Sequence, residues 1–440
     1  MVAFLLHANL ERMIFTGKEE IRLPESSLLE QIRSDAIPFR EFNAEPIFNQ
    51  VGNAKYVLLG EATHGTSEFY TIRSEISKKL IQEKGFSFIA VEGDWPSCYA
   101  LNRYVKGYSQ ETNVYDVMRA FNRWPTWMWA NREIVELAEW LKAYNAELPV
   151  EKRVGFYGLD MYSLWESIDE VIQHLTKTGS PELETAKKVF SCFEPFERDG
   201  HEYGISASFF STDCEEEVVQ LLVELQKKRS TSAEDPESEL NLEINSLVAL
   251  HAERYYRAMV KGGPDSWNIR DTHMVEVAHR LMNFHGNEAK AIIWEHNTHV
   301  GDARATDMVE EGEINVGQLL REQHEKDEVY IVGFGTHRGT VIAAREWGAP
   351  LEEMQVPPAA RHSWEDYLHL AGPENKVILF SSGQDIYRKV IGHRAIGVVY
   401  HPRYERGNYV PTRLSDRYDA FIYVDETKAL SPLVLEHVYV

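Results

Sequence analysis

Short apolar runs alternate with amphipathic segments along much of the chain. The runs that predict buried strands cover residues 56–59, 86–91, 153–159, 289–294 and 328–334. Between the first two, Phe69, Ile72, Ile76 and Leu80 recur at spacings of three and four, which predicts an amphipathic helix over residues 66–84. Strand, helix and strand in this order form a βαβ unit. The pattern therefore predicts an α/β fold with a mostly parallel central sheet and flanking helices.

The same pattern divides one predicted domain into four parts. Residues 1–50 are a leader packed on the core, with a helix near 26–37, and residues 51–163 are the first half of the core. Residues 164–287 are a large helical insertion or lid, with helices predicted at 167–176, 181–189, 215–228, 240–260 and 269–284 and an exposed loop at 230–238. Residues 288–440 complete the core, and strands at 377–381, 395–400 and 420–424 continue the sheet or cover its edge.

Polar side chains follow each of the five core strands. In chain order they are Glu61 and His64, Glu92 and Asp94, Asp160, then Glu295, His296 and His299, and finally His337 and Arg338. The carboxyl ends of parallel strands share one edge of a sheet, and ligands bind there in open α/β folds. One polar strand end means little, because strands usually end in polar turns. Five of them predict a common cleft.

Glu61 and His64 are the sharpest pair, since they stand between two glycines where a strand ends and a helix begins. Alone, such a pair is more often a turn carboxylate with a structural histidine. The polar residues at the other strand ends favour a catalytic role for Glu61 and His64. The dipole of the following helix would lower the pKa of His64, which would keep the imidazole neutral and able to act as a base. A nearby carboxylate would hold the ring in one tautomer.

The remaining candidates stay open between structural and functional roles. Arg73 either covers apolar surface or points into the cleft and binds a substrate oxygen. His296 and His299 could bind a metal, stabilise an oxyanion or donate a proton. Glu92 and Asp94 could be a second base with its partner, or metal ligands. The Arg270–His273 pair and the His251–Arg254 pair are solvated helix faces unless the insertion closes over the cleft, in which case Arg270 binds substrate.

Charge and cysteine content narrow the partners and the compartment. A net charge of −23 without a basic stripe disfavours nucleic acid and anionic membranes as partners. Three cysteines without a CxxC pattern predict no disulfide framework and a reducing compartment. There is no basic n-region, no cleavage site and no run of about 18 apolar residues. We therefore expect a cytoplasmic monomer that takes a small-molecule substrate.

Several catalytic signatures are missing from the sequence. It contains no GxSxG, HExxH, Walker A or GxGxxG motif. A serine hydrolase of the α/β-hydrolase type and a nucleotide-dependent enzyme are therefore disfavoured.

Blocks spread over most of the chain resemble the erythromycin esterase family. They are LLGEATHGTSEFYTIRSEISKKLIQEKGFSFIAVEGDW, GFYGLDMYSLWES, SWNIRDTHM, IIWEHNTHVGDARAT and RAIGVVYHPRYERGNY, and they span about residues 50 to 430. The resemblance implies an α/β core with a large helical insertion that forms one side of a deep cleft, and hydrolysis of an ester without a serine nucleophile or covalent intermediate. Some relatives are macrolide-resistance enzymes, and others carry labels linked to succinoglycan, an exopolysaccharide.

By matching motifs, the resemblance also implies residue roles. His64 would be the general base that deprotonates water, and Glu61 would orient it. His296 and His299 would polarise the carbonyl or serve the leaving group, and Arg73 would contact substrate. We place Glu92 with the catalytic residues, and we expect the other substrate-binding residues to be His299, Asp94, Asp160, Arg270 and His337.

Two alternatives to the metal-free esterase remain. The GE-x-x-H start also resembles a wider superfamily with haem-binding and metal-dependent members, so Glu61, His64 and His296 could hold a divalent metal. A binding protein with a vestigial cleft is the other alternative. We expect specificity to reside in the insertion and in the loop from Trp124 to Trp129, whose aromatic side chains suit a bulky, partly apolar or sugar-bearing ligand, although core packing explains them equally well.

Overall fold

The computed structural model describes residues 25–196, 203–206, 214, 218–219, 221, 236–381 and 384–434. Most of the predicted helix at 215–228, most of the predicted loop at 230–238 and the first 24 residues of the predicted leader lie outside these described residues. Within them, no helix is both long enough and apolar enough to cross a bilayer.

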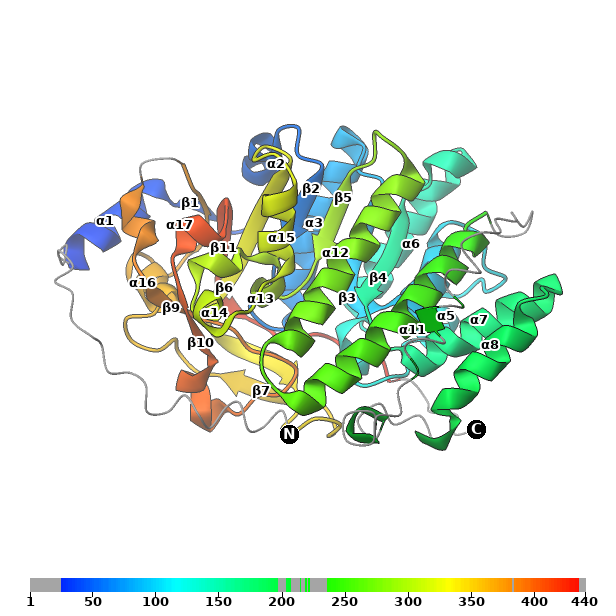
Figure 1. Cartoon of the computed structure of the whole chain (residues 1–440). Helices are drawn as coiled ribbons and strands as arrows, with labels where there is room; N and C mark the ends of the chain where they lie inside the picture. The colour runs from blue at the N-terminus through cyan, green and yellow to red at the C-terminus, as the bar shows by residue number, and fades with distance from the viewer. Residues whose placement is uncertain are drawn as a thin grey trace.

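A nine-stranded sheet forms the centre of the described structure (Figure 1). Six neighbouring strands run parallel, in the order β11–β6–β2–β5–β3–β4. Their bounds are β2 Tyr56–Leu59, β3 Phe88–Asp94, β4 Gly155–Asp160, β5 Ala291–Trp294, β6 Val329–Ala343 and β11 Ala420–Thr427. This confirms the predicted α/β fold with a mostly parallel sheet.

Antiparallel strands complete the edges. β8 (Asn375–Leu379) pairs with β11, β1 (Ile37–Phe39) pairs with β8, and β7 (Glu352–Val356) pairs with the end of β6. The strand predicted at 395–400 is wrong. A strand instead precedes it, β9 (Ile391–Arg394), which pairs with β10 (Tyr409–Thr412) in a separate small sheet. Residues 395–398 then cross the carboxyl ends of the core strands, where the backbone N–H of Ile396 donates to the carbonyl of Ala62.

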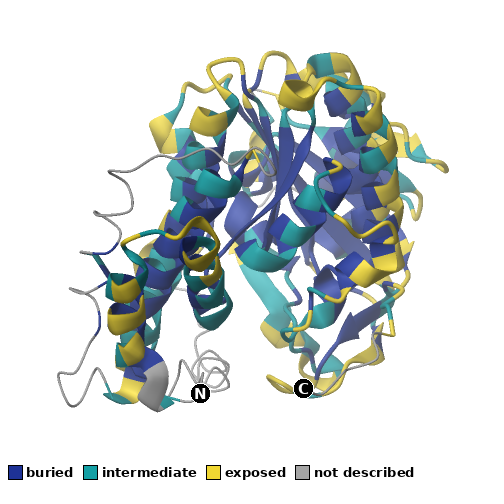
Figure 2. Cartoon of the chain, turned by 90° about the vertical axis from the view of Figure 1, so that its right-hand side faces the viewer, coloured by how far each residue is buried: buried dark blue, intermediate teal, exposed yellow. Residues whose placement is uncertain are grey.

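Both faces of the sheet are buried, so its core strands are apolar on both sides. In β2, Val57 and Leu59 join one apolar cluster and Tyr56 and Leu58 join the other, as the period of a strand requires. The first cluster draws on α2 (Glu45–Val51), α3 (Ser67–Lys84), α5 (Val114–Met118) and α6 (Arg132–Ala146). The second draws on α1 (Glu25–Asp35), α11 (Ser238–Lys261), α12 (Asp265–His285), α15 (Val316–Gln323) and α16 (Trp364–Leu370), and α4 (Trp95–Val105) contributes to both. Figure 2 shows the buried strands between the two helical layers.

The helical section between β4 and β5 is only partly separate from the sheet. Helices α7 (Leu164–Thr178) and α8 (Leu183–Phe190) share an apolar cluster of their own with one side of α11. They lie beyond the edge strand β4 (Figure 1). Helix α12 and the other side of α11 instead cover the sheet, through residues such as Leu247 and Val277. The region predicted as an insertion, 164–287, therefore supplies part of one layer that covers the sheet, and α7 and α8 with one side of α11 form a side lobe.

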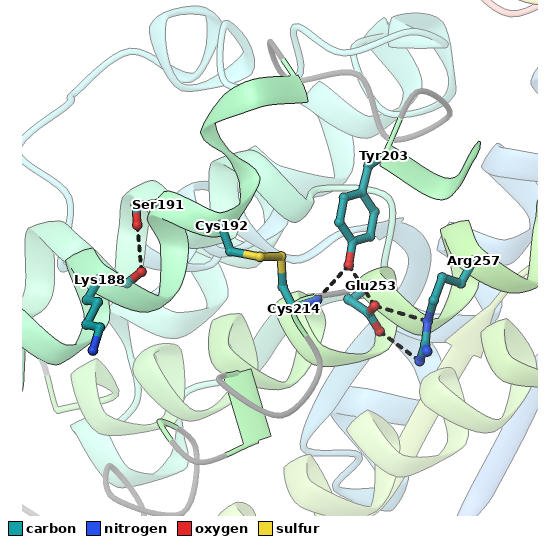
Figure 3. The surroundings of a disulfide bond; sticks show 7 residues. All are labelled: Lys188, Ser191, Cys192, Tyr203, Cys214, Glu253 and Arg257. Atoms are coloured by element: carbon teal, nitrogen blue, oxygen red, sulfur yellow. Dashed lines mark hydrogen bonds and ion pairs between the residues drawn. A yellow bond between two sulfur atoms is a disulfide. The ribbon is translucent and has the colours of Figure 1, made fainter. Parts of the chain in front are cut away.

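A disulfide joins Cys192 and Cys214 within this side lobe (Figure 3). This disulfide shows that the prediction of a chain without disulfides is wrong. The sequence did not reveal the pair, because the two cysteines are 22 residues apart and only the fold brings them together. Cys98 is free and buried in the core. The cysteine content therefore gives no support for a reducing compartment.

The remaining elements are short and lie mostly in the connections. They are the helices α13 Asn297–Val300, α14 Met308–Glu311 and α17 Leu414–Arg417, and the 3₁₀ turns η2 Thr126–Met128, η3 Val150–Lys152, η4 Ser191–Phe196, η5 Ala303–Ala305, η6 Asp385–Arg388 and η7 Pro402–Asn408.

Candidate active site

A cavity of about 400 Å³ lies at the carboxyl ends of the adjoining strands β2, β5, β3 and β4. Seven of the ten predicted site residues line it: His64, Glu92, Asp94, Asp160, Arg270, His296 and His299. The topology explains this convergence, because the strands run parallel and place their C-terminal loops on one edge.

The loop after β2 brings His64 to the cavity. A Cβ atom on Gly60 would lie 2.1 Å from the side-chain oxygen of Asn297, and one on Gly65 would lie 1.9 Å from the carbonyl of Ile342. The two glycines that flank the Glu61–His64 pair are thus required by close backbone packing. Gly60 allows this loop to lie directly against the loop after β5, where Asn297 donates its backbone N–H to the carbonyl of Glu61, and Gly65 allows it to lie against β6.

His64 is held by a buried carboxylate. Its Nδ1 lies 2.8 Å from Oε1 of Glu61, and Arg73 donates to Oε2 of the same carboxylate. Because a carboxylate accepts, the Nδ1 of His64 carries the proton, and the lone pair of the neutral ring is on Nε2. Burial lowers the pKa of His64, but the carboxylates of Glu92 and Glu61 outweigh it and raise the pKa above its usual value of 6.5. The predicted lowering by the helix dipole is therefore wrong: His64 precedes the helix cap at Thr66, and carboxylates decide its charge.

Glu92 is the centre of a charged network around Arg270. Arg270 donates to Glu92 over 2.8 Å and to both oxygens of Asp160, over 3.0 and 2.6 Å. The second oxygen of Glu92 accepts the backbone N–H of His296. Burial raises the pKa of Glu92, but the imidazoles of His299 and His64 and the guanidinium of Arg270 lower it far below its usual range. Glu92 is therefore ionised, and its Oε1 lies 3.9 Å from Nε2 of His64, too far for a direct hydrogen bond.

His299 is fixed on both nitrogens and on its face. Its Nδ1 lies 2.9 and 3.0 Å from the two carboxylate oxygens of Asp271, and its Nε2 lies 3.0 Å from a guanidinium nitrogen of Arg270. Since a guanidinium only donates, Nε2 accepts and Nδ1 donates. The ring of Trp267 stacks on His299, with centroids 4.5 Å apart and planes 7° apart. His299 therefore has little freedom to change partners.

His296 has a free donor. Its Nδ1 lies 2.8 Å from the hydroxyl oxygen of Thr298 and accepts the backbone N–H of Thr298 over 3.3 Å. The backbone N–H can only donate and the hydroxyl can also donate, so both contacts are satisfied when the proton of the neutral ring is on Nε2. Burial and the neighbouring His64 lower the pKa of His296 well below its usual value, which keeps the ring neutral. Among the described residues, Nε2 is buried without a hydrogen-bond partner. The rings of His64 and His296 face the same space, with centroids 4.8 Å apart.

Three predicted site residues do not line the cavity. Glu61 lies behind His64 and acts on it through the hydrogen bond already described. Arg73 is fully buried between Glu61 and the rings of Tyr70 and Trp294, so it cannot contact a substrate in this arrangement. Its place fits a positioning residue for Glu61.

His337 lies elsewhere because β6 does not end where the pattern predicted. The strand continues from Val329 to Ala343, which puts His337 in mid-strand and away from the cavity. There its ring stacks on His369, with centroids 3.9 Å apart. A substrate-binding role for His337 therefore has no support in the structure.

Four residues of the site were missed by the sequence reasoning: Asp271, Trp267, Arg123 and Tyr162. Asp271 and Trp267 stand in the block SWNIRDTHM beside Arg270, so that block carried a signal. Tyr162 comes two residues after the end of β4 and stands in the block GFYGLDMYSLWES, so that block carried a signal as well. Arg123 stands in a loop, and no spacing rule connects it to a strand end. Of the tryptophans in the predicted specificity loop, Trp129 lines the cavity and Trp127 is buried in the core.

The alternative metal ligands do not fit a metal site. Both oxygens of Glu61 are already used by His64 and Arg73, so of the three residues only His64 and His296 present a free ligand atom, Nε2, to the cavity. Over the described part of the chain, no three His, Cys, Asp or Glu side chains are grouped so that they could hold a metal ion.

Comparisons with known proteins agree with this fold. Solved structures that share it include a succinoglycan biosynthesis protein, with a TM-score of 0.75, 20% identity and coverage of 93% of this chain and 98% of that one. A protein from Bacillus cereus has a TM-score of 0.77 and 19% identity, with coverage of 93% and 100%. A mutant of the erythromycin esterase EreC in its open conformation has a TM-score of 0.62 and 15% identity, with coverage of 92% and 98%.

The sequence comparisons lead to a family. Erythromycin esterase type II from Escherichia coli is 18% identical over 399 residues, which cover 80% of this chain and 88% of that protein. The sequence model of the family described as erythromycin esterase matches residues 81–427, well over half of the chain. The chain therefore belongs to the erythromycin esterase family, and it is an esterase-like hydrolase.

Proposed function

We propose that the protein hydrolyses a carboxylic ester with a water molecule activated by His64, without a serine nucleophile or a covalent intermediate. One observation supports this most: two imidazoles face the same space, and one can accept a proton there while the other can donate a hydrogen bond. His64 presents an accepting Nε2 when neutral, and His296 presents a donating Nε2 that has no partner among the described residues. A base and an oxyanion donor are the two groups that attack of water on an ester requires.

The 3.9 Å between Nε2 of His64 and Oε1 of Glu92 suits a bridging water. Such a water donates one hydrogen to each group, and its lone pair is then free to attack. His64 takes a proton as the water oxygen bonds to the ester carbon. The carbonyl oxygen becomes an oxyanion that accepts from Nε2 of His296. When the C–O bond breaks, His64 returns the proton to the alkoxide, so that one ester and one water give one acid and one alcohol.

The charges around the pair support this order of events. The carboxylates of Glu61 and Glu92 stabilise the imidazolium that His64 becomes, which is the physical meaning of its raised pKa. Neutral His296 beside it adds no competing positive charge in the ground state. Arg270 keeps Glu92 in place through the network with Asp160, and Asp271 keeps His299 in place.

For the substrate we propose a bulky, partly apolar ester, of which a macrolide lactone is one candidate. The cavity volume of about 400 Å³ is within the usual range for small-molecule sites. Aromatic side chains from several parts of the chain line it, among them Phe121, Trp129, Trp267 and Trp347.

A matched set of assays tests this function. Macrolides, acylated sugars and aryl esters are incubated with the wild-type protein and with His64→Ala, and acid release is measured. We expect release from at least one class, its near-complete loss in the variant, and full activity after treatment with a strong chelator. Activity that disappears on chelation and returns with a divalent metal would replace this proposal by the metal-dependent alternative. Ligand binding without any turnover would favour the binding-protein alternative.

A further inference from the structure

The cavity holds a second polar pair, Asp94 and Arg123, beside the network around Arg270. Asp94 is the last residue of β3, just after a register shift in its pairing with β4, and Arg123 donates from Nε to Oδ2 of Asp94 over 2.5 Å. Both guanidinium groups lie against the ring of Tyr162, Arg270 at 4.9 Å and Arg123 at 5.3 Å from its centroid. The pair is thus one aromatic ring away from the charged network that holds Glu92.

Asp94 and Arg123 keep unused hydrogen-bonding capacity. The side chain of Asp94 is nine-tenths buried, and its Oδ1 has no partner among the described residues. Burial raises the pKa of Asp94 to about 6, against the effect of Arg123. Arg123 has five N–H donors, and its bonds to Asp94 and to the carbonyl of Trp124 use three of them. A buried acceptor that lacks a donor is costly, so a ligand that supplies one gains free energy.

The chemistry of this pair selects the ligand. Asp94 repels a carboxylate, and Arg123 repels an ammonium group, so neither an anion nor a cation suits both. A hydroxyl group donates as well as accepts, and neighbouring hydroxyls can satisfy Oδ1 of Asp94 and the remaining N–H groups of Arg123 together. The wall beside the pair is aromatic, with Phe121, Trp129 and Trp347 lining the same cavity. A ring with hydroxyl groups on its edge and C–H groups on its faces matches this combination.

We propose that the ester is carried by a carbohydrate, whose hydroxyl groups bind Asp94 and Arg123 and whose ring packs on the aromatic wall. This rests on the proposed ester hydrolysis, in which the acyl carbon lies between His64 and His296. The carbohydrate is then the alcohol product, and the acyl group is released as the acid.

A pair of substrates that differ only in hydroxyl groups tests the proposal. The first is the 6-O-acetyl ester of glucose, galactose or mannose, and the second is (tetrahydropyran-2-yl)methyl acetate, which keeps the ring and the ester arm and lacks the ring hydroxyls. A hydrogen bond to a charged group is worth about tenfold in binding. We therefore expect kcat/KM for the best hexose ester to exceed that for the tetrahydropyran ester by at least about tenfold. Asp94→Asn and Arg123→Gln should bring this ratio close to one.

A matched variant controls for the loss of an ion pair. Arg338 is exposed and pairs with Glu426 outside the cavity, so Arg338→Gln should keep the wild-type ratio. Equal kcat/KM for both substrates in the wild-type protein would overturn the carbohydrate proposal, and so would turnover of aryl esters alone, while the proposed hydrolysis would stand in both cases.

If no ester is hydrolysed, the hydrolytic function fails and binding decides the carbohydrate proposal separately. Methyl hexopyranosides are titrated into the protein, and the fluorescence of the cavity tryptophans is followed. Saturable change that is lost in Asp94→Asn and Arg123→Gln would support the subsite. No change up to high millimolar sugar would overturn it.

Discussion

The loops after β2 and β5 lie side by side and carry the same residue types, yet their chemistry is opposite. Each strand is followed by a glutamate and a histidine, Glu61 with His64 and Glu295 with His296. Both oxygens of Glu61 are hydrogen-bonded, whereas neither oxygen of the buried Glu295 has a partner among the described residues. The pKa of His64 is raised by carboxylates, and that of His296 is lowered by burial and by His64.

The difference comes from what each glutamate faces. Glu61 lies on the side of the sheet where Arg73 of α3 provides a buried cation. Glu295 lies near the carboxylates of Asp271 and Glu92, and burial together with these neighbours raises its pKa well above the usual value. Identical residues at equivalent strand ends thus give a carboxylate that serves a base and a carboxylic acid that serves none. The surroundings of a motif decide its chemistry.

Of the changes to the two loops, removal of His64 should reduce kcat the most. His64→Ala eliminates the base, and a positioned base contributes on the order of 10²- to 10⁴-fold to rate. We expect kcat to fall by that factor with little change in KM or in the melting temperature, measured on whichever ester the wild-type protein hydrolyses. His401→Ala, outside the cavity, is the matched control. An unchanged rate in His64→Ala would remove His64 from the mechanism.

Removal of His296 should have the next largest effect. His296→Ala deletes the free Nε2–H donor, and the loss of one oxyanion donor costs about 10²- to 10³-fold in kcat. The acid limb of the pH profile should remain, because His64 and Glu61 are intact. If His296→Ala instead raised KM alone, the ring would bind ground-state substrate and would not stabilise the oxyanion.

Glu295 should contribute to stability and not to turnover. Its pKa is raised in the folded protein, so folding favours the protonated form, and stability is lost as pH rises from about 4.5 through the folded pKa. Glu295→Gln removes this loss. The difference in melting temperature, variant minus wild type, should therefore increase by a few degrees as the pH rises above about 5. A difference that is constant with pH would show that Glu295 is not protonated in the fold.

The sequence predicted the sheet and most of the cavity because both depend on local patterns. Apolar runs identified the parallel strands, and the residues at or just after the carboxyl ends of β2, β3, β4 and β5 converge as the parallel arrangement of these strands requires. The prediction failed at His337, since β6 runs without a break through GTHRG although the glycines and polar side chains of that stretch are typical of a strand end. It also failed for Arg73 and for the Cys192–Cys214 disulfide, which depend on which side of an element faces which neighbour.

The charge states were the least predictable part of the site. The pKa of His64 depends on Glu92, which is 28 positions away in sequence and belongs to another strand. The free donor of His296 depends on the backbone N–H of Thr298. These charge and hydrogen-bonding states can be derived only from the folded geometry, because the spacing of residues in the sequence does not determine which group donates a hydrogen bond and which accepts it.

The dependence of kcat/KM on pH, in the wild-type protein and in Glu61→Gln, tests the central claim most directly. A base with a raised pKa is inactive when protonated, so wild-type activity should fall as pH decreases through an apparent pKa above 6.5. Glu61 is one cause of that raised pKa, and its neutral replacement should move the acid limb to lower pH. A limb that stays in place in Glu61→Gln, or wild-type activity that does not change between pH 5 and pH 9, would contradict the claim that His64, held by Glu61, activates the water.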